Sequence, residues 1–263
     1  KDILSSTGAL SLDKVPEKLV VIGAGYIGLE MGSVWSRLGS KVTVIEYAER
    51  IVPNMDIEIS KQFQKILIKQ GIDFKLSTSF KKINNKNGKL HVLIETQQGQ
   101  TSEISCDKVL ISIGRKPYTF GLNLEAVGIE TDERGFIKTL NNFQTSVSNI
   151  YAIGDCKLGP MLAHKASEEG TALAEILVGQ AGHINFDTIP SVVYTSPEVA
   201  SVGKTEEELK EANINYKVGK FPFTANARAK VMHATEGFVK ILSDASSDKV
   251  LGVHMIGADV GNM

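Results

Sequence analysis

The segment Gly23-Ala24-Gly25-Tyr26-Ile27-Gly28 constrains the fold of this chain more than any other feature. It directly follows residues 19–22, a short apolar run that predicts a buried strand, and a helical stretch follows it to about residue 38. Residues 41–46 predict a second strand, so the region forms one β-α-β unit. A G-x-G-x-x-G pattern between a strand and a helix is typical of a dinucleotide-binding turn.

Each glycine of this pattern has a physical role in holding a pyrophosphate. Gly23 permits the tight turn, Gly25 lets the phosphates approach the backbone, and Gly28 lets the helix pack closely on the strand. The amides of the first helical turn and the helix dipole then face the two phosphates. The alternative is a glycine-rich turn with no ligand, which would not account for the acidic residue that closes the second strand.

That acidic residue, Glu46, indicates which dinucleotide binds. Its carboxylate can accept hydrogen bonds from a ribose 2′-hydroxyl, whereas a 2′-phosphate would meet like charge, so the sequence favours NAD over NADP. Arg50 complicates this preference because it follows closely, and we interpret it as a surface residue.

The remaining elements before residue 115 complete a Rossmann-like α/β domain. Residues 56–70 predict a helix with Ile59, Phe63, Ile66 and Leu67 on one face, and residues 72–76 and 109–113 predict strands. Residues 89–95 alternate between apolar and polar after the turn dipeptide Asn87-Gly88, which indicates a further strand.

A second candidate ligand loop follows in the middle of the chain. Residues 150–153 predict a short buried strand that delivers Gly154 and Asp155 to a loop, where the carboxylate could meet a ligand hydroxyl or cap the next segment. A helix is predicted over residues 163–178. Its amino-terminal amides would suit an anionic or electron-rich ligand edge, and they belong to Met161, Leu162, Ala163 and His164. A lone histidine such as His164 is more often structural than functional.

Strands dominate the carboxyl-terminal part, over residues 192–195, 216–221, 237–242 and 250–256. One helix interrupts them, and it opens with the capping-box pattern Thr205-x-x-Glu208. This order predicts an antiparallel α+β layer. The chain stops after a strand with no helix to cover the sheet, so we expect it to be a piece of a longer protein.

Composition excludes several function classes. The chain has 42% hydrophobic residues and a net charge of -1, which gives no electrostatic footprint for nucleic acid or for an anionic membrane. No apolar stretch is long enough to predict a membrane span. The two cysteines, Cys106 and Cys156, are too far apart for a metal motif or a disulfide framework, so we expect two reduced thiols and no metal site.

Taken together, these motifs resemble the flavoprotein pyridine nucleotide-disulfide oxidoreductases. The resemblance covers essentially the whole chain, and its motifs are specific in combination. They are VVIGAGYIGLE (residues 20–30), GSVW (32–35), SIGRKP (112–117), YAIGD (151–155), GPMLAHKA (159–166), PSVVYTSPE (190–198) and GKFPF (219–223).

The resemblance implies a site for NAD in the first domain. Glu46 would hold the adenosine ribose, Phe80 would line the adenine pocket and Gly114 would lie against the bound nucleotide. Glu30 would reach toward the contact between nicotinamide and flavin. The pyrophosphate loop would comprise Gly23, Ala24, Gly25, Tyr26, Ile27, Gly28, Leu29 and Glu30.

The resemblance also implies part of a site for FAD. Asp155 would bind the ribityl chain, and the flavin would be lined by Met161, Leu162, Ala163 and His164. The implied domains are an NAD-binding domain over residues 1–115, a central segment of the FAD-binding region over 116–184, and a truncated antiparallel interface domain over 185–263. The family dimerises through this last domain, so a homodimer is expected.

Within the family, the match is to members that oxidise dihydrolipoyl groups on a lipoyl-bearing carrier protein of a 2-oxoacid dehydrogenase complex. Electrons would pass through a redox disulfide and FAD to NAD⁺, in the bacterial cytoplasm or the mitochondrial matrix. Two alternatives remain: a related reductase that acts on another disulfide, on a metal ion or with NADP, and a module that binds NAD without turnover.

The groups that carry out the chemistry in the family have no counterpart in this sequence. The family's redox-active C-x₄-C pair does not occur, and its His–Glu pair would lie beyond Met263. We therefore expect no catalytic residue in this chain and no lipoamide-dependent turnover by the chain alone.

Overall fold

The computed structural model describes residues 2–263. It divides into two compact units, one that runs to residue 113 and includes residues 190–263, and one that comprises residues 114–189. We call them the first unit and the second unit and describe each by itself.

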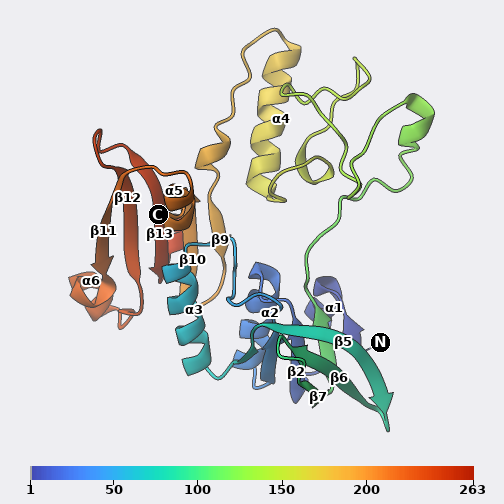
Figure 1. The fold of residues 1–263 in the computed structure, drawn as a ribbon, viewed down its shortest axis with the longest axis vertical. Helices are drawn as coiled ribbons and strands as arrows, with labels where there is room; N and C mark the ends of the chain where they lie inside the picture. Colours follow the sequence, from blue (N-terminus) through green and yellow to red (C-terminus); the bar gives the residue numbers. More distant parts are fainter. Residues whose placement is uncertain (1) are drawn as a thin grey trace. The chain divides into compact units, whose positions relative to one another are not determined.

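A five-stranded parallel sheet forms the amino-terminal half of the first unit (Figure 1). Its strand order, β1-β8-β2-β3-β4, places β2 at the centre, next to β3 and β8. The helices of this region are α1 (Ser6–Leu10), α2 (Tyr26–Arg37) and α3 (Ile57–Lys69). The strands are β1 (Ile3–Leu4), β2 (Lys18–Ile22), β3 (Lys41–Ile45), β4 (Asp73–Lys75) and β8 (Lys108–Ile111). The predicted β-α-β unit is confirmed.

The helix α3 also follows its prediction. Asp56 is its N-cap, and the Asp56 side chain accepts a hydrogen bond from the amide of Glu58. The predicted apolar face is buried throughout, and it consists of Ile59, Phe63, Ile66 and Leu67. Gly71 has a φ of +99° just beyond the helix, where a residue with a side chain would be strained.

A three-stranded antiparallel sheet covers the parallel sheet. It consists of β5 (Thr78–Lys86), β6 (Lys89–Thr96) and β7 (Thr101–Cys106). Asn87 and Gly88 both have positive φ at the predicted turn. The buried face of β6 packs on the parallel sheet through one shared core, which includes Leu90, Val92, Ile94, Val20, Ile22, Ile45 and Val109.

The carboxyl-terminal part of the first unit is an antiparallel sheet with the order β11-β12-β13-β10-β9. The predicted antiparallel layer is therefore confirmed, although β10 was not among the predicted strands. The strands are β9 (Ser191–Val193), β10 (Glu198–Gly203), β11 (Tyr216–Pro222), β12 (Phe238–Asp244) and β13 (Val250–Gly257). The helices are α5 (Glu206–Glu211), which carries the predicted capping box, and α6 (Ala227–Val231).

In the first unit, the parallel sheet and the five-stranded antiparallel sheet share one hydrophobic core. A single cluster joins buried residues of α2 and α3 to Val193, Val199, Phe238 and Ile256 of the antiparallel sheet. In Figure 1, α3 lies beside β10 and β13. The part of the chain after residue 190 is thus packed against the parallel sheet and its helices.

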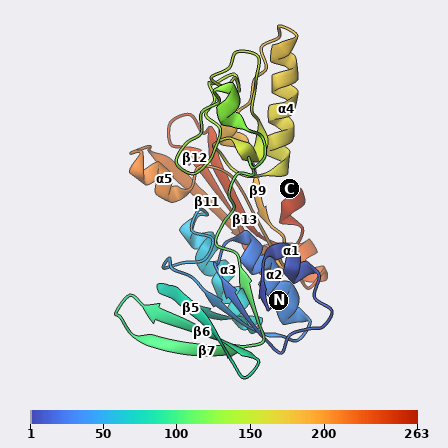
Figure 2. The ribbon, with the colours of Figure 1, turned by 90° about the vertical axis from the view of Figure 1, so that its right-hand side faces the viewer.

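The second unit contains mostly loops around one long helix, α4 (Ala163–Leu177) (Figure 2). Its short 3₁₀ helices are η1 (Leu124–Val127), η2 (Gly154–Cys156) and η3 (Phe186–Thr188). The strand predicted over residues 150–153 is wrong, because only an isolated bridge joins Tyr151 to Gln144. Loop residues satisfy the backbone instead: the amide of Ile150 donates to Val147 and that of Ala152 donates to Phe143.

Within residues 2–263, the structure contains no helix that is both long and apolar enough to cross a membrane.

Candidate functional site

The glycine loop has the geometry that the sequence predicts. Gly23 has a φ of +104°, and a Cβ there would lie 2.5 Å from the carbonyl oxygen of Ser112. A Cβ on Gly28 would lie 2.2 Å from the carbonyl oxygen of Gly23. Both positions therefore require glycine for the turn itself.

Gly25 differs from the other two glycines because the space beside it is open. A Cβ there would meet nothing within 4 Å. Gly25 is also the N-cap of α2, which has no side-chain cap and no acidic residue in its first turn. This amino terminus fits a pyrophosphate, since its amides and dipole have no carboxylate of their own to face.

Glu46 lies directly beside this loop at the end of β3. Its Oε2 accepts a hydrogen bond from the amide of Ala24 at 2.7 Å, and its Oε1 accepts one from the amide of Ala48 at 2.8 Å. Each carboxylate oxygen can accept a second hydrogen bond, so the residue fits a ribose with two hydroxyl groups. Arg50 is half-buried, and its Nη2 donates to the carbonyl of Pro53 at 2.5 Å.

The loop residues after Gly25 divide between solvent and core. Tyr26 is exposed and Ile27 is half-buried, whereas Leu29 is fully buried and belongs to the core beneath the helix. Ala24 is also fully buried, so only its backbone is available to a ligand.

Glu30 of α2 makes a contact that the sequence did not predict. Its Oε1 accepts a hydrogen bond from the amide of Tyr194 at 2.8 Å, which joins α2 to the connection between β9 and β10. Burial raises the pKa of Glu30, although the hydrogen bond from Tyr194 acts in the opposite direction. A carboxyl group with a raised pKa is a candidate functional group.

Phe80 and Gly114 lie in different units. Phe80 is on β5 opposite Ile94, at an irregularity in the strand pairing, and 37% of it is exposed. Gly114 is the first residue of the second unit, with a φ of +125° and open space where a Cβ would lie.

The second ligand loop is built around Gly154 and Asp155 in η2. Gly154 has a φ of +70°, and the Asp155 side chain is 41% exposed. The Oδ2 atom of Asp155 lies 3.4 Å from Nη2 of Arg115, a partner that the sequence did not predict. Asp155 does not cap α4, since the N-cap of that helix is Leu162.

The amino terminus of α4 resembles that of α2 in its chemistry. Leu162 provides no side-chain cap, and the first turn has no acidic residue. Met161 and Leu162 are half-buried, while Ala163 and His164 are exposed. The exposed turn with uncapped amides fits the electron-rich edge of a flavin.

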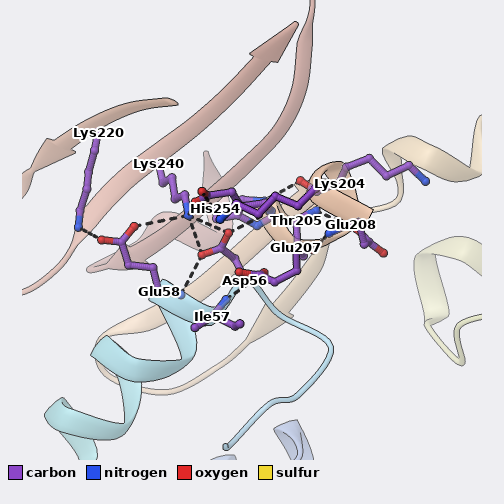
Figure 3. Close-up of polar contacts among 12 residues, drawn as sticks. Asp56, Ile57, Glu58, Lys204, Thr205, Glu207, Glu208, Lys220, Lys240 and His254 are labelled. Carbon is purple, nitrogen blue, oxygen red and sulfur yellow. Dashed lines mark hydrogen bonds and ion pairs between the residues drawn. The ribbon is translucent and has the colours of Figure 1, made fainter. Parts of the chain in front are cut away.

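A third group of polar residues lies between α3 and the antiparallel sheet (Figure 3). Lys240 of β12 is 1% exposed, and its Nζ lies 2.9 Å from Oδ2 of Asp56 and 2.5 Å from Oε2 of Glu206. His254 of β13 is buried beside them, and its Nε2 donates to the carbonyl of Lys204 at 2.9 Å. Asp56 is also fully buried, whereas Glu206 is half-buried, and we call Asp56, Glu206 and Lys240 the ion triad.

Burial and ion pairing compete within this triad. Desolvation lowers the pKa of Lys240, but the hydrogen bonds to Glu206 and Asp56 outweigh it and raise the pKa above its ordinary value. Desolvation alone would raise the pKa of Asp56, yet Lys240 holds it below its usual range. The triad therefore stays fully charged at neutral pH.

Glu206 makes the stability of the first unit sensitive to acid. Hydrogen bonds from Lys210 and Lys240 lower its pKa to about 2, whereas a glutamate in an unfolded chain titrates near ~4.3. The unfolded state therefore takes up this proton first as the pH falls, so the stabilisation is complete above ~4.3 and is lost toward about 2. We expect urea unfolding midpoints to fall over this range, and to fall less steeply in Glu206→Gln. An equally steep fall of the midpoint with pH in the wild-type protein and in Glu206→Gln would contradict this role of Glu206.

Comparison with known proteins agrees with this geometry. Residues 1–170 match the family model "pyridine nucleotide-disulphide oxidoreductase", and residues 189–263 match the dimerisation domain of the same family. The chain belongs to the pyridine nucleotide-disulphide oxidoreductase family. Members of this family use FAD and a nicotinamide dinucleotide as cofactors.

Individual relatives are similar over the full length of the chain. Mitochondrial dihydrolipoyl dehydrogenase of Pisum sativum is 54% identical and covers 100% of this chain, which corresponds to 53% of the relative. Leghemoglobin reductase of Glycine max is also 54% identical over 100% of this chain and 50% of its own length. The chain spans about half the length of the curated relatives it matches.

A solved structure confirms the fold class. The HOCl-induced flavoprotein disulfide reductase RclA of Escherichia coli superposes with a TM-score of 0.90 and 30% identity. The match covers 100% of this chain and 60% of that chain. The Rossmann-like domain and the antiparallel carboxyl-terminal layer that the sequence predicts are thus those of a flavoprotein disulfide reductase.

Proposed function

We propose that this chain is part of an NAD-dependent dihydrolipoyl dehydrogenase. The single observation that carries the nucleotide assignment is the open, uncapped amino terminus of α2 with Glu46 hydrogen-bonded to the loop beside it. The dihydrolipoyl assignment is supported by the identity of 54% to a dihydrolipoyl dehydrogenase over the whole chain.

The chain contributes binding and orientation in this proposal. Bound flavin and nicotinamide supply the hydride chemistry. The amides that follow Gly25 hold the pyrophosphate, Glu46 accepts hydrogen bonds from the adenosine ribose, and Phe80 lines the adenine pocket. Glu30 orients the nicotinamide, and burial raises the pKa of its carboxyl group.

The flavin contacts of this chain come from the second unit. Asp155 accepts hydrogen bonds from the ribityl hydroxyls, and Nη2 of Arg115 lies 3.4 Å from the same carboxylate. The flavin ring would lie against the start of α4, where Met161 and Leu162 precede the first helical turn and Ala163 and His164 belong to it. Gly114 lies against the nicotinamide dinucleotide, because its lack of a side chain permits a close approach.

The proposal extends to partners and location. The electron donor is a dihydrolipoyl group on the carrier protein of a 2-oxoacid dehydrogenase complex. The protein forms a homodimer through the segment that matches the family's dimerisation domain. The location is the mitochondrial matrix or the bacterial cytoplasm, because close relatives come from both sources.

A second candidate is a reductase of another substrate on the same flavin scaffold. The similarity to leghemoglobin reductase and to RclA favours it, since both have names that describe other activities. The two candidates are separated by rates of the full-length protein with dihydrolipoamide and with NADH plus a non-lipoyl disulfide such as oxidised glutathione. A faster reaction with the second pair would support the alternative.

Glu46→Gln tests the nucleotide assignment directly. The loss of the charged acceptor is expected to weaken NAD binding by about tenfold, and to narrow the preference over NADP because repulsion of the 2′-phosphate is removed. Calorimetric titration of this chain with both nucleotides measures the effect, and Glu49→Gln, at an exposed neighbouring position, is the control. Unchanged affinity for both nucleotides in Glu46→Gln would rule out the ribose contact.

A further inference from the structure

The peptide groups of Gly154 are held from both sides by buried charged residues of α4. The carboxylate oxygen Oε2 of Glu169 accepts a hydrogen bond from the Gly154 amide at 2.6 Å. The ammonium group of Lys165 donates to the Gly154 carbonyl oxygen at 3.3 Å. Glu169 is 0% exposed and Lys165 is 1% exposed, so neither contact competes with solvent.

The conformation held in this way is an unusual one. Gly154 has a φ of +70°, which favours glycine, and a Cβ at this position would lie 3.3 Å from the Cβ of Ala166. Glycine can leave such a conformation easily, because it has the largest choice of backbone angles. The two contacts therefore restrict the backbone conformation of Gly154, which glycine alone would not restrict. Through this conformation they also set the orientation of the next residue, Asp155.

The cluster of Lys157, Lys165 and Glu169 contains more charged groups than the packing of α4 against the loop requires. Oε1 of Glu169 lies 3.0 Å from the ammonium groups of both Lys157 and Lys165, so two cations share one carboxylate. Burial of charged groups costs free energy, and apolar residues of similar size often stabilise a core equally well. A requirement for two polar contacts at the Gly154 backbone explains why charged residues stand here.

We propose that Glu169 and Lys165 are positioning residues that preset the Asp155 carboxylate for hydroxyl groups of a bound ligand. The inference rests on the proposed function, in which that ligand is the ribityl chain of FAD. Glu169 itself does not touch the flavin. It acts through the Gly154 backbone and thereby through Asp155.

In a purely structural role, Glu169 and Lys165 would instead join the loop to α4, and their effect on ligand affinity would not depend on Asp155. A double-mutant cycle separates the two roles, because residues that act through one another give non-additive losses. Asp155→Ala removes the carboxylate, and Glu169→Gln removes its support. The positioning role predicts that Glu169→Gln has little further effect once Asp155 is gone.

The experiment measures FAD affinity of the full-length protein after removal and readdition of FAD, followed by flavin fluorescence. We expect the dissociation constant to rise about tenfold in Glu169→Gln and further in Asp155→Ala, with no additional rise in the double variant. Glu168→Gln, an exposed neighbour on the same helix, should leave affinity unchanged. If Glu169→Gln does not fold, Lys165→Met replaces it, because Glu169 then keeps Lys157 as a partner.

The outcomes separate this inference from the proposal on which it rests. Additive losses, or wild-type affinity in both Glu169→Gln and Lys165→Met, would overturn the positioning role and leave the flavin site intact. Wild-type affinity in Asp155→Ala would contradict the flavin site itself.

Discussion

Replacement of Lys240 with methionine is expected to lower the free energy of unfolding of the first unit by about 3–5 kcal/mol, since removal of one partner leaves buried charge uncompensated. Asp56 is fully buried and Lys240 is its ion-pair partner in the triad. Asp56 also caps α3. Loss of the Lys240 ammonium group therefore weakens the contact between α3 and the antiparallel sheet that contains β12.

Trp35 provides the measurement. It is the single tryptophan of the chain and lies in the shared core of the first unit, so its fluorescence during urea unfolding reports on that unit. Lys217→Met is the matched control, because Lys217 lies on the neighbouring strand β11 and pairs with Asp248 at an exposed site. If both variants lose under about 1 kcal/mol, as is typical of exposed pairs, the triad has no special role.

Substitution of Gly25 with leucine is expected to abolish NAD binding without any loss of stability. The side chain would enter open space, and Gly25 has a φ of -77°, which leucine adopts without strain. That open space is where the pyrophosphate must approach the backbone, so we expect a loss of at least about 100-fold in affinity, or about 2.7 kcal/mol.

Titration of this chain with NAD⁺, together with unfolding followed at Trp35, separates the two effects. Gly28→Ala serves as the opposite case, because its Cβ would collide with the carbonyl oxygen of Gly23 and the fold itself should suffer. Gly25→Leu with normal NAD affinity would show that the nucleotide does not bind at this helix terminus.

Local patterns explain why much of the fold could be predicted. The glycine loop, α3 with its buried face, and the turn at Asn87 and Gly88 all depend on residues close in sequence. Glu46 could be predicted because the fixed length of a β-α-β unit places the end of the second strand beside the loop.

Two of the strands that escaped prediction, β5 and β7, have polar sequences. β5 contains several lysine and asparagine side chains and β7 contains mainly threonine, serine and glutamate, and they are strands because β6 between them pairs with both. The strand predicted over residues 150–153 failed for the opposite reason. Ala152 is buried and Ile150 and Ile153 are half-buried, but no described neighbour pairs with the segment beyond one isolated bridge.

The contacts of the candidate sites that escaped prediction are those between distant residues. Glu30 meets the backbone of Tyr194, and Lys240 meets Asp56, across separations that no sequence pattern encodes. Glu169 and Gly154 are closer in sequence, yet a carboxylate that faces inward from a helix looks the same in sequence as one that faces solvent. Such contacts appear only when the tertiary structure is known.

The most direct test of the proposed function is dihydrolipoamide-dependent reduction of NAD⁺ by the full-length protein, followed at the NADH absorbance, with NADP⁺ in parallel. We expect rapid turnover with NAD⁺ and little with NADP⁺. No turnover from a protein with intact flavin would contradict the dihydrolipoyl assignment, and equal turnover with NADP⁺ would contradict the role of Glu46.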